Sequence, residues 1–122
     1  MPKEESFAVN RIKSVGFAMR GALLLIRTEA SIKIQVFLAI VVTIAGFYYE
    51  ISATEWILQI FAVSLVMGIE GANTAIEKIC DFIHPEFDAR IGFIKDVAAG
   101  AVMLVSIGAT IIGCIIYLPK IF

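Results

Sequence analysis

Three long apolar stretches, separated by short polar ones, constrain the fold of this chain more than any other feature. Of its 122 residues 60% are hydrophobic, and the mean hydropathy is +0.93, whereas ordinary soluble domains are about 45–50% apolar. A helix of roughly 20 apolar residues crosses the hydrocarbon layer, and a backbone in lipid must satisfy its own hydrogen bonds. The sequence therefore predicts an all-α membrane protein with a single domain, 1–122, and no room for a separate soluble catalytic domain.

The polar interruptions divide the chain into segments. The expected segments are a frayed polar end at 1–5, an amphipathic surface helix at 6–28 and membrane spans at 31–49, 53–83 and 96–118. His84-Pro85 stops the second span, and Asp96 is placed to cap the N-terminus of the third. The second span measures about 46 Å at 1.5 Å per residue, and the hydrocarbon layer only about 30 Å. Its last turns are therefore expected to emerge into water or headgroups.

Basic residues indicate the orientation of the chain. Six of the ten Lys and Arg residues lie at or before residue 33, three surround the second connection, and the first connection has none. Because cytoplasmic loops carry the excess of basic residues, we expect the N-terminus and the second connection in the cytoplasm and the C-terminus outside. Lys13, Arg20 and Arg27 repeat every seven residues and form one stripe on the surface helix. This stripe either anchors lipid phosphates or also holds a soluble phosphate substrate.

The second span runs directly into a group of acids. Trp56 to Ile69 carries no charge, and an arc of about 80° on the following turns holds Glu70, Asn73, Glu77 and Asp81. The opposite side is a strip of small residues, which suits close approach of another helix: Gly68, Gly71, Ala72 and Ala75. Three glycines of the third span suit close packing in the same way: Gly100, Gly108 and Gly113. Ionisable residues at a membrane boundary are functional candidates, and a solvated helix end is the alternative interpretation.

Several acids and one lysine are expected to meet at this boundary, namely Glu29, Glu70, Glu77, Asp81, Lys95 and Asp96. Carboxylates suit Mg²⁺, which takes one or two of them together with substrate phosphates. A further carboxylate can act as a general base toward a hydroxyl, and a lysine can neutralise phosphate charge. The inventory fits phosphoryl transfer from a metal nucleotide to a lipid alcohol. A small proton-coupled transporter and a membrane scaffold are the alternatives.

These motifs resemble the small bacterial integral-membrane diacylglycerol kinase family, which includes the undecaprenol kinases. The family signature of an acid, Asn-(Ser/Thr)-Ala-Ile-Glu and an Asp reads here as Glu70, Asn73-Thr74-Ala75-Ile76-Glu77 and Asp81. A second match is Lys95-Asp96-Val97-Ala98-Ala99-Gly100-Ala101-Val102, and a weaker one runs through Gly21 and Glu29. The central motif, together with His84-Pro85, looks more like the undecaprenol-kinase side of the family.

The resemblance implies a lipid kinase of the bacterial cytoplasmic membrane. It would transfer the γ-phosphate of ATP, with Mg²⁺, to the primary hydroxyl of undecaprenol or diacylglycerol, giving undecaprenyl phosphate or phosphatidic acid. The family also implies a homotrimer, with active sites shared between neighbouring subunits.

The resemblance further implies a role for each matching residue. Glu70 would bind the lipid hydroxyl and act as the catalytic base, while Glu29 and Glu77 would hold the metal. The nucleotide contacts would be Lys13, Phe17, Glu29, Asn73, Glu77, Asp81, Glu86, Lys95 and Asp96. The chain departs from the enterobacterial branch at two positions near the nucleotide, with Asn10 and Phe17 in place of an arginine and a tyrosine.

Overall fold

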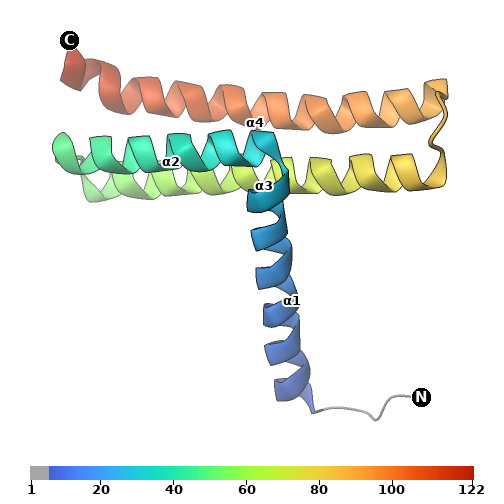
Figure 1. Cartoon of the computed structure of the whole chain (residues 1–122). Coiled ribbons are helices and arrows are strands. Elements are labelled where there is room, and N and C mark those ends of the chain that lie inside the picture. Colours follow the sequence, from blue (N-terminus) through green and yellow to red (C-terminus); the bar gives the residue numbers. More distant parts are fainter. Residues whose placement is uncertain (1–5) are drawn as a thin grey trace.

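A computed structural model describes residues 6–122, so the end expected at 1–5 lies outside the described residues. The described part forms four helices, α1 (Phe7–Thr28), α2 (Ala30–Tyr48), α3 (Ala53–Ile83) and α4 (Ala89–Ile121). The last three are long and apolar enough to cross a membrane and lie side by side, while α1 projects crosswise from them (Figure 1). The prediction of an all-α membrane protein with one N-terminal helix and three spans is confirmed.

The unequal lengths of the helices shape the bundle. With 19 residues, α2 covers only part of α3 and α4, which have 31 and 33. The junction of α1 and α2 therefore lies beside the middle of α3 (Figure 1). There, a Cβ on Gly71 would lie 3.0 Å from Cδ1 of Leu25. Beyond this level, α3 and α4 continue as a pair toward their connection. We call this the α3–α4 end and the opposite one the α2–α3 end.

Polar contacts tie the three spans together at the α2–α3 end. Gln59 is only 6% exposed, and its Nε2 donates to the carbonyl of Val42 at 3.1 Å. The hydroxyl of Tyr117 lies 3.0 Å from the same carbonyl and also hydrogen-bonds to Oε1 of Gln59. Lys120 forms an ion pair with Glu55 at 2.7 Å. Within an apolar layer, polar groups have no water available as a hydrogen-bond partner. These mutual bonds therefore fix the relative positions of the three helices.

The small residues expected to suit close helix packing have few neighbours within the described chain. On the strip opposite the acids, Gly71 meets Leu25, whereas Gly68, Ala72 and Ala75 are exposed. In α4, a Cβ on Gly100, Gly108 or Gly113 would meet nothing within 4 Å in the described chain, so close packing at these glycines stays a prediction for contacts with another chain. The small residues have few neighbours because α4 packs on the side of α3 that carries the polar residues. Gly46 is the closely packed glycine, because a Cβ at this position would lie 2.6 Å from the ring of Trp56.

The last helix begins earlier than predicted. It starts at Ala89, and its N-cap is Asp88, whereas the sequence favoured a start and cap at Asp96. An Asp88 oxygen accepts the backbone N–H of Arg90 at 2.8 Å, and the Arg90 guanidinium lies 3.3 Å from the same carboxylate. These hydrogen bonds from Arg90 lower the pKa of Asp88, so that the cap stays ionised. Asp96 consequently lies within the helix and is exposed.

Gly46 generates a stability prediction. Replacing it by Ala forces the ring of Trp56 away from its contact with Phe47, whose ring centroid lies 4.9 Å away. We expect Gly46→Ala to destabilise the protein by about 1–3 kcal/mol. Thermal unfolding in detergent measures this, with Gly108→Ala as the matched control, because that Cβ enters open space. Equal melting temperatures for the two variants would contradict the packing described here.

Candidate functional site

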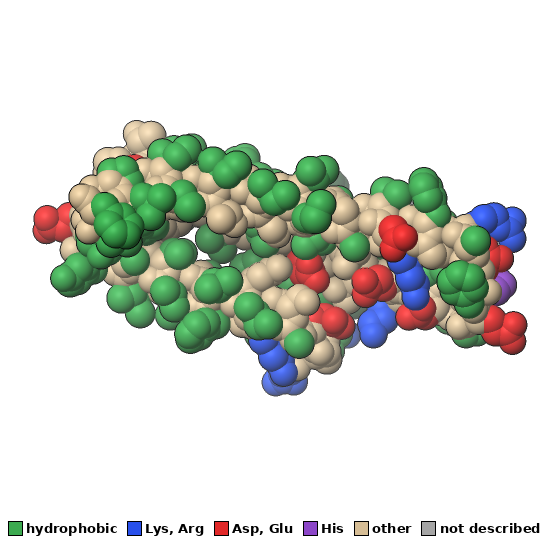
Figure 2. Space-filling model, turned by 90° about the horizontal axis from the view of Figure 1, so that it is seen from above, with side chains coloured by type: hydrophobic (Ala, Val, Ile, Leu, Met, Phe, Trp, Pro, Cys, Tyr) green, Lys and Arg blue, Asp and Glu red, His purple; other side chains and the backbone are tan. Residues whose placement is uncertain are grey.

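Glu70 lies in α3 beside the α1–α2 junction and is 8% exposed. It lines a cavity of about 590 Å³ between α2, α3 and α4, which we call the groove. Ser31, Gln35 and Glu70 are polar residues toward one end of the groove, and Gln59 and Tyr117 lie at the other. The walls between them are mostly apolar and include Leu38, Val66, Met67 and Ile112. Figure 2 shows an opening between the helices in the largely hydrophobic half of the molecule.

Polar groups continue from Glu70 toward the α3–α4 end. Asn73 is 8% exposed and donates from Nδ2 to Glu77 at 3.3 Å. Among residues 6–122 its Oδ1 is buried without a hydrogen-bond partner, which is costly unless a ligand provides one. Lys95 of α4 contacts Asp81 of α3 at 2.6 Å. Charged side chains gather over this half of the molecule in Figure 2.

A divalent cation would need ligands beyond those of one chain. Among residues 6–122, no three His, Cys, Asp or Glu side chains form a group that could hold a metal ion. However, Oδ1 of Asn73 and the carboxylate of Glu77 are neighbouring hard oxygen donors of the kind that Mg²⁺ takes. Because Mg²⁺ completes its shell with waters and substrate phosphates, this pair fits a cation that arrives with a nucleotide.

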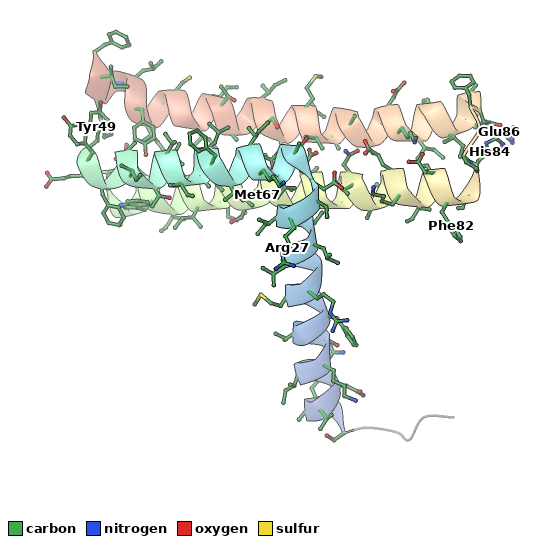
Figure 3. The ribbon with its side chains drawn as sticks, in the orientation of Figure 1. Arg27, Tyr49, Met67, Phe82, His84 and Glu86 are labelled. Atoms are coloured by element: carbon green, nitrogen blue, oxygen red, sulfur yellow. The ribbon has the colours of Figure 1, made fainter. Side chains whose placement is uncertain are left out.

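The described chain does not bring all the predicted residues together. Phe17 on α1 is 64% exposed, and its ring lies 5.8 Å from the guanidinium carbon of Arg20. Lys13 is also on α1, and Glu29 is half-buried at the junction with α2. Figure 3 shows Glu86 and His84 at the α3–α4 connection, well away from Arg27 on α1. The expected meeting of all these groups does not occur within one chain.

Sequence reasoning missed Gln35. It lines the groove from α2, and its Oε1 is buried without a partner in the described chain. The sequence could have pointed to Gln35, because it is the sole amide or charged side chain between residues 34 and 48. A polar group that lies within an apolar span and faces inward is a functional candidate.

The fold and the site define a class of protein. A buried carboxylate at the meeting point of an apolar groove and a polar helix face suits a small membrane protein that acts on an amphipathic molecule. The comparisons with known proteins agree. The profile described as prokaryotic diacylglycerol kinase matches residues 16–117, and the chain belongs to this family.

Two relatives are similar over most of their length. An undecaprenol kinase from Bacillus subtilis (strain 168) is 35% identical over 120 residues, which cover 98% of each chain. A diacylglycerol kinase from Escherichia coli (strain K12) is 30% identical over 105 residues, which cover 86% of each. The predictions of this family and of a lipid kinase are confirmed, and the transporter alternative finds no support.

Asn73 generates a prediction that separates function from stability. Because Asn73→Leu removes a buried acceptor that has no partner, we expect the melting temperature to hold or rise while lipid phosphorylation falls at least about tenfold. Thermal unfolding and a phosphorylation assay measure the two effects. The matched control is Gln59→Leu in the same helix, which removes a fully partnered amide and should destabilise the protein by about 1 kcal/mol. Full activity in Asn73→Leu would contradict a ligand-binding role.

Proposed function

We propose that the chain is an ATP- and Mg²⁺-dependent kinase that phosphorylates the primary hydroxyl of a membrane lipid alcohol. The observation that carries the proposal is the position of Glu70. This carboxylate is buried, lines an apolar groove on one side and is followed by a polar helix face on the other. A lipid alcohol has the same two-part character, with an apolar chain ending in a hydroxyl.

Glu70 is proposed to act as the general base. With the lipid chain in the groove, the hydroxyl lies at the Glu70 carboxylate, which accepts its proton while the oxygen bonds to the γ-phosphorus. The bond from that phosphorus to the bridging oxygen breaks, and ADP leaves with the electron pair. The groove keeps the acceptor in place and excludes water from it, which favours transfer to the lipid over hydrolysis.

The polar helix face is proposed to hold the nucleotide. Asn73 and Glu77, together with Glu29, would hold a Mg²⁺ ion, which would neutralise charge on the phosphates. Lys95 is paired with Asp81 in the described chain, but both side chains are well exposed, at 37% and 59%. Exposed pairs are weak, so a nucleotide phosphate can replace Asp81 as the partner of Lys95. The remaining proposed nucleotide contacts are Lys13, Phe17, Glu86 and Asp96.

Undecaprenol is the acceptor that the comparisons favour. The relative named undecaprenol kinase is 35% identical and matches 98% of this chain, whereas the diacylglycerol kinase from Escherichia coli is 30% identical and matches 86%. The Asn-Thr-Ala-Ile-Glu motif followed by His84-Pro85 supports the same choice. Diacylglycerol, which also offers a primary hydroxyl at the interface, is the second candidate.

A homotrimer in the bacterial cytoplasmic membrane is the proposed working form. Three observations support shared active sites: the exposed strip around Gly68, Ala72 and Ala75, the scattered nucleotide residues, and the absence of a three-ligand metal group within residues 6–122. The excess of basic residues around α1 and the α3–α4 connection supports a cytoplasmic site and N-terminus, with the C-terminus outside.

Glu70→Gln tests the proposed base. The amide keeps the size of the side chain but cannot accept the proton, so phosphorylation should fall by about 100-fold or more, the usual contribution of general-base catalysis. The assay supplies labelled ATP, Mg²⁺ and, in parallel, diacylglycerol and a short-chain undecaprenol analogue to the purified protein in mixed micelles. Wild-type labelling should stop when the metal is chelated with EDTA and return when Mg²⁺ is added.

The parallel assays with the two lipids also identify the substrate class. Faster labelling of the undecaprenol analogue by the wild type supports the proposed acceptor, and faster labelling of diacylglycerol overturns that choice while leaving the kinase. A folded Glu70→Gln protein with full activity overturns the assignment of the base.

Ala72→Leu tests the proposed assembly. Ala72 is exposed on the strip of α3, and a leucine there would hold two helices apart. We expect the variant to lose the trimer, measured by size-exclusion chromatography with light scattering in detergent. Ala101→Leu is the matched control, since Ala101 is equally an exposed alanine but lies on α4. Retention of the trimer by the Ala72 variant would exclude the strip from the interface.

A further inference from the structure

The groove has a closed end that the catalytic proposal does not use. From Glu70 to Gln59 along α3 the distance is 11 residues, or about 16 Å at 1.5 Å per residue. At that depth Gln59 from α3 and Tyr117 from α4 both line the groove. They are hydrogen-bonded to each other and to the carbonyl of Val42 in α2. One residue from each of the three spans therefore meets at the same depth.

The closed end is held by hydrogen bonds, which are stronger in apolar surroundings than in water. Gln59 is 6% exposed, and both polar atoms of its amide have partners. The ring of Tyr49 packs edge-on against that of Tyr117, with 6.1 Å between centroids. Opening the closed end would leave the Gln59 amide and the Tyr117 hydroxyl without these partners in a layer without water, which is unfavourable. The end therefore stays shut when an apolar chain enters.

We propose that Gln59 and Tyr117 form the floor of the groove and limit how far the hydrocarbon chain of the lipid alcohol enters it. The inference rests on the proposed function, because it assumes that the acceptor hydroxyl lies at Glu70. The groove is continuous with that carboxylate, and its walls between the two polar ends are mostly apolar. These features fit a single extended hydrocarbon chain, which lies along the groove from the hydroxyl to the floor.

The floor makes chain length a specificity determinant. Each additional methylene buried against the walls contributes about fourfold to kcat/KM, from the usual transfer free energy of a methylene. This gain ends when the chain reaches the floor, about 16 Å from Glu70. A longer chain must leave the groove sideways into the surrounding lipid, so its extra length adds nothing.

Two glycines of α4 provide a matched pair of variants. A Cβ on either Gly113 or Gly108 meets nothing within 4 Å, so both positions accept a side chain in the described chain. Gly113 lines the groove and Gly108 does not. Gly113→Leu should therefore shorten the usable groove, and Gly108→Leu should leave it unchanged. Tyr117→Ala should act in the opposite direction by deepening the groove.

The experiment measures kcat/KM for the full chain in mixed micelles, with a homologous series of straight-chain monoacylglycerols, ATP and Mg²⁺. Chains range from shorter than the groove to about twice its length. Dividing the kcat/KM of each variant by that of the wild type at the same chain length removes the effect of substrate partitioning into the micelle. For Gly113→Leu, we expect long chains to lose at least about tenfold relative to short ones, with no such change for Gly108→Leu. For Tyr117→Ala, we expect the plateau to move to longer chains.

The outcomes separate the floor from the proposed function. A wild-type length profile in Gly113→Leu overturns the floor even if Tyr117→Ala fails to fold, and so does an equal change in the two glycine variants. Failure of the wild-type protein to label any of the alcohols, including the undecaprenol analogue, overturns the proposed function instead. A loss on long chains in Gly113→Leu that Gly108→Leu does not show, with short chains still phosphorylated, supports the floor.

Discussion

The unequal lengths of the three spans are the constraint on which the rest of the structure depends. A backbone in lipid must form helices, and a helix of 19 residues nearly matches the hydrocarbon layer, whereas helices of 31 and 33 residues exceed it. The surplus lies on one side because α1 and α2 meet beside the middle of α3. The pair formed by α3 and α4 can carry charged residues there, because this surplus length is not needed to cross the apolar layer. Along α3, the change from the uncharged stretch of Trp56 to Ile69 to polar residues falls at Glu70.

The bundle has two parts that differ in how completely their polar groups are hydrogen-bonded. Toward the α2–α3 end, partnered groups such as Gln59, Tyr117 and Val42 hold three helices in place. Toward the α3–α4 end, the groups are incompletely partnered, as Oδ1 of Asn73 shows, or exchangeable, as the exposed pair of Lys95 and Asp81 shows. Satisfied polar groups fix a structure, and a buried unsatisfied group is a candidate for binding a ligand. Glu70 belongs to both parts, because it lines the groove and begins the polar face.

Hydropathy and motif spacing predicted the helices and the acidic arc of α3, because both depend on local periodicity. The start of α4 was not predicted, since Asp88 and Asp96 are both capable caps and their hydrogen-bonding geometry decides between them. The packing of small residues was not predicted either. Periodicity shows that Gly68 and Ala72 share a face, but it does not say which helix, from which chain, meets that face. Gln35 and Tyr117 gain their significance from the groove, which exists only once three helices are assembled.

The crosswise direction of α1 has a consequence for membranes of different thickness. The single extended residue Glu29 joins α1 to α2, so α1, in its expected position along the membrane surface, would hold the level of Glu70 relative to the headgroups on its side. Hydrophobic mismatch must then be absorbed at the far side, around the turn from Tyr49 to Ser52, by local thinning or thickening of the bilayer. In that arrangement, the depth of the Glu70 carboxylate would be set by one leaflet alone.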